Sequence, residues 1–250
     1  MPKIIAIIDL AKQAGTIIMN HYHSDNIEIT YKADSSPVST ADLESNQLIC
    51  NSLSRLYPNI PIISEENDNI SGKHQLFWSI DPLDGTKSFL NRDGEFTVNI
   101  ALIKDKIPIL GVIYSPLSNE LYYVDESKIP YKQSANKQDI AIQARPLPNE
   151  GATVLISSSS INNPKLKLYL QDKKINKIIP TSSALKICRI AEGLADLYPR
   201  FGQTMEWDTA AGHAILNAAG GSIRDLNGQT LTYGHAENQY YNPEFIVTGK

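Results

Sequence analysis

The strongest constraint on the fold is a series of short strand-like segments in the middle of the chain. They lie at residues 95–103, 107–114 and 121–124, with weaker candidates at 128–132 and 139–143. The first of them alternates apolar and polar side chains, and the polar residues 104–106 are short enough to join two strands as a hairpin. Consecutive short strands with tight turns predict an antiparallel sheet.

Two amphipathic helices are expected beside this sheet. Residues 3–23 carry apolar side chains at three- and four-residue spacing. A second helix starts where Ser39 or Thr40 can cap it and runs to about Leu56. The N-terminal half therefore combines an antiparallel sheet with paired helices, which is an α+β arrangement.

The second half of the chain changes character. Strand-like and helical segments alternate there, at residues 153–156, 163–171, 176–180, 182–192 and 195–199. Such alternation favours a more parallel arrangement. The stretch 145–150, which contains two prolines, separates the two patterns. We therefore predict an N-terminal half at 1–147 and a smaller α/β C-terminal half at 148–250, so that the whole is layered α/β.

One motif stands at the end of an apolar strand at 76–80. It reads Asp81-Pro82-Leu83-Asp84-Gly85-Thr86. Pro82 is expected to end the strand at Asp81, because proline restricts the residue before it and lacks an N–H. Thr86 could cap a following helix, whose first N–H groups would bind an anion. An ordinary surface turn has the same composition, so the motif alone does not establish a site.

Further carboxylates occupy the ends of other elements. Glu65 follows a short apolar strand at 60–64, and Asp208 lies at the start of a helix. Each could be a solvated loop residue or a helix N-terminal acid. If Glu65, Asp81, Asp84 and Asp208 converge, they repel one another unless cations neutralise them. A set of oxygen ligands without His or Cys suits Mg²⁺ rather than Zn²⁺.

Composition excludes several classes of function. The net charge of −4 gives no overall basic character, which argues against a nucleic-acid polymer as a partner. The two cysteines are far apart in apolar runs, which favours reduced thiols and a cytoplasmic location. Asp9 and Lys12 interrupt the apolar N-terminal run, so neither a signal peptide nor a transmembrane segment is expected.

Three motifs together resemble the inositol monophosphatase-like, lithium-sensitive phosphatase superfamily. They are Ser64-Glu65-Glu66, Asp81-Pro82-Leu83-Asp84-Gly85-Thr86 and Trp207-Asp208-Thr209-Ala210-Ala211-Gly212. The Asp-x-x-Asp spacing differs from the Asp-x-Asp of haloacid-dehalogenase phosphatases. The resemblance covers nearly the whole chain and implies a layered αβαβα sugar-phosphatase-like fold, with metals and substrate between the two halves.

Within this superfamily, residues 87–103, 111–116 and 188–200 resemble the bacterial 3′(2′),5′-bisphosphate nucleotidase branch. The resemblance implies Mg²⁺-dependent removal of the 3′-phosphate from adenosine 3′,5′-bisphosphate, a small-molecule substrate. Hydrolysis of inositol or sugar monophosphates by the same chemistry is the alternative. A non-catalytic regulator that binds metal and phosphate is the third alternative. The superfamily includes dimers, so a monomer or a homodimer is expected.

The resemblance also implies roles for individual residues. Two or three Mg²⁺ would be held by the carboxylates of Glu65, Asp81, Asp84 and Asp208 and the carbonyl of Leu83. Gly85 and Thr86 would bind the scissile phosphate, and Asp208 would contact the substrate. Asp42, Thr86 and Glu65 would be catalytic, with the Thr86 hydroxyl and Asp42 orienting and deprotonating the attacking water. Lys32 matches a basic residue near the site.

The chain departs from the nucleotidase branch at the start of its second half. The branch commonly has Ser-Arg-Ser-His there, whereas this chain has Ser158-Ser159-Ser160-Ile161. Ser158 and Ser160 can still donate hydrogen bonds to a substrate phosphate, without the charge of an arginine. We expect Lys186 to supply part of the missing charge.

Overall fold

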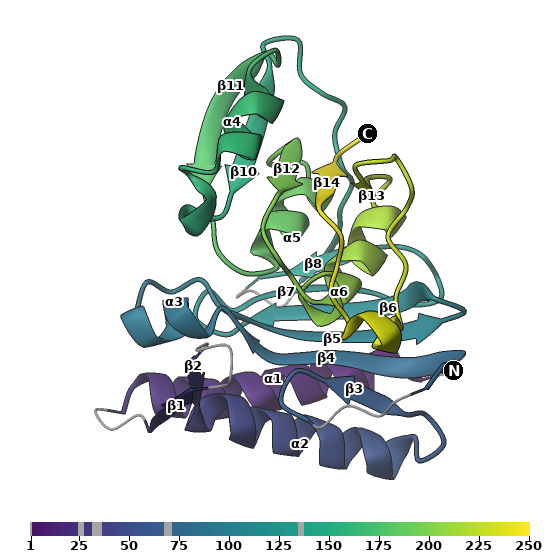
Figure 1. Ribbon diagram of the computed structural model, residues 1–250. Helices are drawn as coiled ribbons and strands as arrows, with labels where there is room; N and C mark the ends of the chain where they lie inside the picture. Colours follow the sequence, from purple (N-terminus) through teal and green to yellow (C-terminus); the bar gives the residue numbers. More distant parts are fainter. Residues whose placement is uncertain (1, 25–27, 32–36, 68–71, 135–137) are drawn as a thin grey trace.

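The computed structural model describes residues 2–24, 28–31, 37–67, 72–134 and 138–250. Five layers follow one another: a pair of helices, a large sheet, a second pair of helices, a smaller sheet and an outer helix (Figure 1). The layered αβαβα fold predicted from the sequence is confirmed. Within the described residues, no helix is long and apolar enough to cross a membrane.

The large sheet contains seven strands in the order β3-β4-β5-β6-β7-β8-β9. Their bounds are β3 Ile62–Ser64, β4 Leu76–Asp84, β5 Thr97–Lys104, β6 Ile107–Ser115, β7 Glu120–Val124, β8 Tyr131–Gln133 and β9 Asp139–Ala141. Every neighbouring pair from β4 to β9 is antiparallel, whereas β3 and β4 are parallel. The predicted antiparallel sheet is confirmed, including its two weaker strands.

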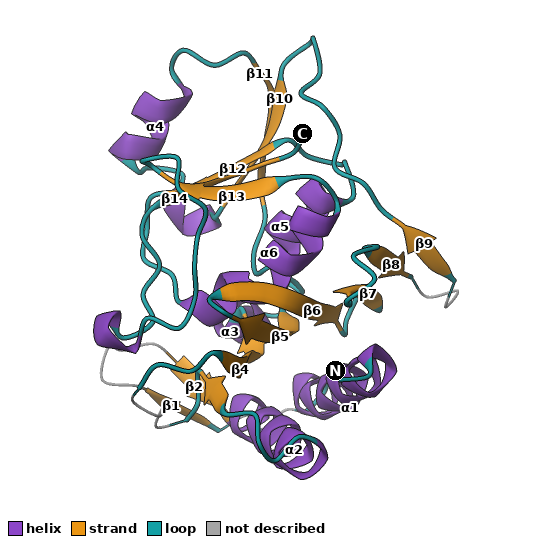
Figure 2. Cartoon of the chain, turned by 90° about the vertical axis from the view of Figure 1, so that its right-hand side faces the viewer, coloured by secondary structure: helices purple, strands orange, loops and turns teal. Residues whose placement is uncertain are grey.

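Helices cover both faces of this sheet. Helices α1 (Ile4–Tyr22) and α2 (Thr40–Leu56) lie on one face and match the predicted pair; α5 (Leu185–Ala191) and α6 (Glu206–Ala218) lie on the other (Figure 2). Small residues let α6 approach closely, since a Cβ on Gly111 of β6 would lie 2.4 Å from the carbonyl oxygen of Ala211. One apolar core runs from the large sheet through α5 and α6 to the smaller sheet.

The smaller sheet has the order β11-β10-β12-β14-β13. Its strands are β10 Ala152–Ile156, β11 Ile175–Pro180, β12 Leu197–Arg200, β13 Ser222–Asp225 and β14 Phe245–Thr248. The pairs β10–β11 and β10–β12 are parallel as predicted, but β14 pairs antiparallel with both β12 and β13. Helix α4 (Pro164–Leu170) is the outer layer.

Two short strands, β1 (Ile29–Tyr31) and β2 (Pro37–Ser39), form a separate antiparallel pair. A division at residue 147 stays a prediction.

Candidate active site

Strand β4 does not end at Asp81, contrary to the prediction from Pro82. Asp81 pairs with Asn99 and Asp84 pairs with Thr97, so the two residues between the aspartates face a single residue of β5. This irregularity is a β-bulge, and a bulge tolerates proline because the extra residue is unpaired in the ladder. In a regular strand, side chains three positions apart point to opposite faces of the sheet. The extra residue of the bulge shifts this alternation by one position. Two aspartates three positions apart can therefore face the same side of the sheet.

Three carboxylates meet at this edge of the sheet. Glu65 follows β3, Asp81 lies in β4 and Asp208 lies in the first turn of α6; each offers an oxygen within 4.8 Å of the others. Burial raises the pKa of Asp81 and Asp208 well above the usual value, and repulsion from neighbouring carboxylates raises both further. Asp81 is buried, whereas Glu65 and Asp208 are partly buried. Oxygen donors that repel one another fit a hard divalent cation such as Mg²⁺. Asp84 is not one of these three, but its charge contributes to the raised pKa of both Asp81 and Asp208. We name Glu65, Asp81, Asp84 and Asp208 the carboxylate cluster.

Asp84 is the member of the cluster that contacts the second half of the chain. Its Oδ2 accepts hydrogen bonds from the backbone N–H of Ala184 at 2.5 Å and from Asn99 Nδ2 at 3.4 Å. Burial raises the pKa of Asp84, while Lys186 and these donors act in the opposite direction. The Asp84 carboxylate thus links the bulge of β4 to the segment that leads into α5.

The predicted pairing of Thr86 with Asp42 is present. The Thr86 hydroxyl lies 3.0 Å from Asp42 Oδ1 and 3.3 Å from the carbonyl oxygen of Leu83. Asp42 Oδ2 accepts from the backbone N–H of Ser39 at 2.8 Å and from its hydroxyl at 2.6 Å. Burial raises the pKa of Asp42. Asp42 therefore both caps α2 and holds a hydroxyl beside the cluster.

Gly85, not Thr86, is the N-cap of the short helix α3 (Thr86–Asn91). Its φ of 93° lies in the left-handed region that favours glycine. A Cβ at this position would lie 2.8 Å from the carbonyl oxygen of Glu95. The predicted cap at Thr86 was wrong because the bulge and the left-handed glycine move the start of the helix back by one residue. Thr86 is instead the first helical residue.

A cleft of about 340 Å³ opens beside the cluster, lined by residues of the segment from β4 to α3 and by residues beyond 156 in the chain. Asp84, Gly85 and Asp208 line it, and so do Ser157 and Ser158, whereas Ser160 is not among its lining residues. The predicted role of Ser158 in binding is thus compatible with the geometry, and that of Ser160 has no support there. Lys32 falls outside the described residues.

Three cationic side chains line the same cleft: Lys87, which is exposed, and Lys186 and Arg200. Lys186 is buried; burial lowers its pKa to about 8, and its Nζ donates to the carbonyl of Ser183 at 2.6 Å. Arg200, at the end of β12, donates to Ser157 Oγ at 2.8 Å and to the carbonyl of Gln203 at 2.9 Å. Its buried Nε has no partner within the described residues. Sequence reasoning missed Arg200 as a site residue, although it ends a strand that leads to the cleft.

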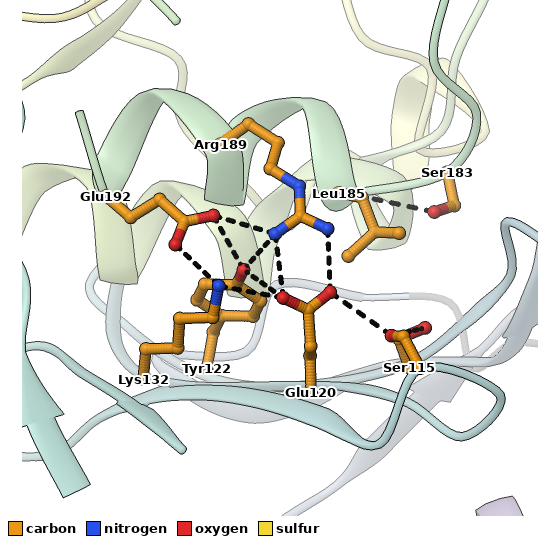
Figure 3. Close-up of polar contacts among 9 residues, drawn as sticks. Ser115, Glu120, Tyr122, Lys132, Ser183, Leu185, Arg189 and Glu192 are labelled. Carbon is orange, nitrogen blue, oxygen red and sulfur yellow. Dashed lines mark hydrogen bonds and ion pairs between the residues drawn. The ribbon is translucent and has the colours of Figure 1, made fainter. Parts of the chain in front are cut away.

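A charged cluster joins α5 to the large sheet. Arg189 donates to Glu120 Oε2 at 2.7 Å, to Glu192 Oε1 at 2.7 Å and to the hydroxyl of Tyr122 at 2.5 Å (Figure 3). Lys132 lies 2.7 Å from both Glu120 and Glu192. We name these five residues the Arg189 cluster. It fixes α5, whose first turn carries Lys186, against β7 and β8.

The layered fold, with a carboxylate cluster beside a cleft lined by both acidic and basic side chains, defines the class as a sugar-phosphatase-like phosphatase. The chain belongs to the inositol monophosphatase family, whose sequence profile matches residues 2–247.

Curated relatives and solved structures agree with this assignment. The chain is 42% identical to the "3'(2'),5'-bisphosphate nucleotidase CysQ" of Salmonella typhimurium, over 97% of this chain and 98% of that one. It is 46% identical to the protein of the same name from Buchnera aphidicola, over 91% and 86%. The crystal structure of CysQ from Bacteroides thetaiotaomicron superposes with a TM-score of 0.82 at 34% identity, covering 98% of this chain and 96% of that one.

Proposed function

We propose that this protein is a Mg²⁺-dependent 3′(2′),5′-bisphosphate nucleotidase that removes the 3′-phosphate of adenosine 3′,5′-bisphosphate. The observation that carries the proposal is the carboxylate cluster next to a cleft whose lining includes Lys186 and Arg200. Relatives named as bisphosphate nucleotidases, at 41–46% identity over most of the chain, support the choice of substrate. A monophosphate substrate has one phosphate group, whereas a bisphosphate has a second phosphate group that the cationic side chains of the cleft can bind.

The carboxylates of Glu65, Asp81, Asp84 and Asp208 and the carbonyl of Leu83 would hold two or three Mg²⁺. When bound, Mg²⁺ supplies charge for the phosphoryl oxygens and lowers the pKa of water. The backbone at Gly85 and Thr86 would bind the scissile phosphate. Asp208, already in the cleft lining, would also contact the substrate.

Asp42 and Thr86 would orient the attacking water and take its proton. The Thr86 hydroxyl is already held 3.0 Å from Asp42 Oδ1. A proton taken by the hydroxyl oxygen can therefore pass along one hydrogen bond to a buried carboxylate whose pKa is raised. Glu65, at the other side of the cluster, would complete the catalytic set.

We expect Thr86→Val to lower kcat about a hundredfold, because it keeps the shape of the side chain and removes the proton path. KM for the bisphosphate and Mg²⁺ binding should change little. Thr86→Ser, which restores the hydroxyl, should recover most of the rate. Equal rates for the Val and Ser variants in a phosphate-release assay would contradict the role of the hydroxyl.

Lys186 and Arg200 would bind the phosphate that is not cleaved. Neutral replacements, Lys186→Met and Arg200→Met, should each raise KM for adenosine 3′,5′-bisphosphate about tenfold or more, since a charge-assisted hydrogen bond is lost. KM for adenosine 3′-monophosphate, which lacks the second phosphate, should change much less. Lys165→Met, at an exposed residue of α4, is the control. Parallel rises of KM for both substrates would contradict this assignment.

The direct test of the substrate is phosphate release with Mg²⁺ from adenosine 3′,5′-bisphosphate and from inositol 1-phosphate at matched concentrations. We expect kcat/KM to favour the bisphosphate strongly. A preference for inositol 1-phosphate would establish the alternative, an inositol or sugar monophosphatase. Binding of both without release would favour a regulator.

We also propose a cytoplasmic protein that acts as a monomer or a homodimer. The two cysteines of the chain, Cys50 and Cys188, are both free thiols, which suits a reducing compartment. One chain supplies every group of the proposed site, so neither assembly is required for chemistry. Sedimentation velocity measures the assembly directly.

A further inference from the structure

Helix α2 carries polar side chains that reach two different segments of the carboxylate cluster. Asp42, Ser45 and Asn46 are all buried. Spacings of three and four residues place them on one face of the helix. Asp42 contacts Thr86, as described above. The contacts of Ser45 and Asn46 have no part in the proton path, and they reach the segments that carry Asp81 and Glu65.

Ser45 determines how one peptide group of the bulge is turned. Its hydroxyl donates to the carbonyl of Pro82 at 2.9 Å. The N–H of the same peptide unit belongs to Leu83 and donates to Asp81 Oδ1 at 3.0 Å. Because a peptide unit is planar and trans, fixing its C=O also fixes the direction of its N–H. The hydrogen bond from Ser45 is therefore transmitted through one rigid plane to the Asp81 carboxylate.

Asn46 holds the turn that contains Glu65. Its Nδ2 donates to Asn67 Oδ1 at 2.7 Å, and its Oδ1 accepts from Ser64 Oγ at 2.7 Å. One side chain thus binds both the residue before Glu65 and a residue two positions after it. The backbone N–H of Glu65 donates to the carbonyl of Ile80 at 3.1 Å, which attaches the turn to β4.

We propose that Ser45 and Asn46 are positioning residues that set the separation of Asp81 and Glu65 for a divalent cation. The inference rests on the metal-dependent function proposed above and deepens it. A neighbour that orients a metal ligand typically contributes ten- to a hundredfold to metal affinity. Neither residue touches the cleft, so the effect should fall on metal binding and leave substrate contacts unchanged.

Direct cation binding to the full chain, without substrate, tests the proposal. Mn²⁺ is a suitable probe because it accepts the same oxygen donors as Mg²⁺ and its free form is measured by paramagnetic resonance. We expect Ser45→Ala and Asn46→Ala each to weaken Mn²⁺ binding about tenfold. Ser54→Ala and Asn51→Ala make the same changes at exposed positions of α2 and should bind as the wild type does.

A double-mutant cycle separates the contact of Asn46 from any general effect on folding. Asn67 is exposed, so Asn67→Ala is unlike a core substitution. Removing either Asn46 or Asn67 breaks the same hydrogen bond. If this bond positions Glu65, Mn²⁺ binding by the double variant should therefore be at most about twofold weaker than binding by Asn46→Ala. Additive losses would overturn this part of the inference.

The thermal midpoint distinguishes positioning from simple destabilisation. A merely structural role would lower the midpoint of the metal-free protein and leave the Mn²⁺ dissociation constant unchanged, and that result overturns the proposal. If the wild type binds Mn²⁺ and the variants bind it equally well, this inference is overturned, whereas the proposed metal-dependent function is not. If the wild type bound no Mn²⁺, the metal-dependent function itself would fail, and this inference with it.

Discussion

Replacing Asp81 with Asn is expected to slow phosphate release about a thousandfold and, at the same time, to stabilise the metal-free protein. Asp81 is 1% exposed and lies within 4.8 Å of oxygens of Glu65 and Asp208. Burial and the repulsion of neighbouring carboxylates raise its pKa well above the usual value, so its charged form is unfavourable when no cation is present. An amide of the same shape removes that charge.

The two effects should be large and opposite in sign. Loss of a ligand shared by the proposed cations should lower kcat about a thousandfold, which corresponds to about 4 kcal/mol at the transition state. Removal of a buried, repelled charge should raise the metal-free thermal midpoint by about 2–4 °C, as expected for about 1 kcal/mol in a chain of this size. Phosphate-release kinetics and calorimetry in a chelator measure the two quantities.

Asp172→Asn is the matched control, because Asp172 is exposed and remote from the cluster. It should change neither quantity. Retained activity in Asp81→Asn would mean that catalysis does not depend on the carboxylate cluster. A lower metal-free midpoint would mean that the charge of Asp81, which strengthens the hydrogen bond from Leu83 N–H, contributes more than the repulsion costs at this position. Stability and activity would then not oppose one another here.

The elements most accessible to sequence reasoning were those with regular periodicity. Helix α1 and the strands from β5 to β7 followed directly from the spacing of apolar residues. The acids at the ends of elements also proved informative, since Glu65, Asp81 and Asp208 do converge. Their convergence could be expected from the family resemblance. From spacing alone, each of them could equally be a solvated loop residue or an acid at a helix N-terminus.

What could not be predicted depends on contacts between distant segments. The bulge at Pro82 requires a partner strand, because proline in an isolated sequence only signals a strand end. Strands β13 and β14 were missed; β14 lies between β13 and β12 in the sheet, and α6 and β13 separate it from β12 in the sequence. The cleft cation Arg200 likewise becomes visible only when β12 is placed beside Ser157.

The Arg189 cluster also depends on contacts between distant segments, so it could not be predicted from the sequence. The second large effect, on the stability of the fold, is expected at this cluster. Arg189→Met should lower the free energy of unfolding at pH 7 by about 3 kcal/mol, because it leaves Glu120 and Glu192 without their main cation. We take the low end of the range for buried ion pairs, since a quarter of the Arg189 side chain is exposed. Urea unfolding of the full chain measures this loss, and Arg55→Met, at an exposed end of α2, is the control.

The pH dependence of that loss identifies its origin. Burial alone would raise the pKa of Glu120, but hydrogen bonds and charge from Arg189 and Lys132 lower it from 4.5 to about 2. A carboxylate with a lowered pKa in the folded state contributes stability above its unfolded pKa, and that contribution is lost as the pH falls through the folded value. The difference between wild type and Arg189→Met should therefore be full above pH 4.5 and shrink as the pH falls towards 2. A difference that stayed constant over this range would mean that Arg189 stabilises the protein by packing on Tyr122, and the Arg189 cluster would then fix α5 by shape rather than by charge.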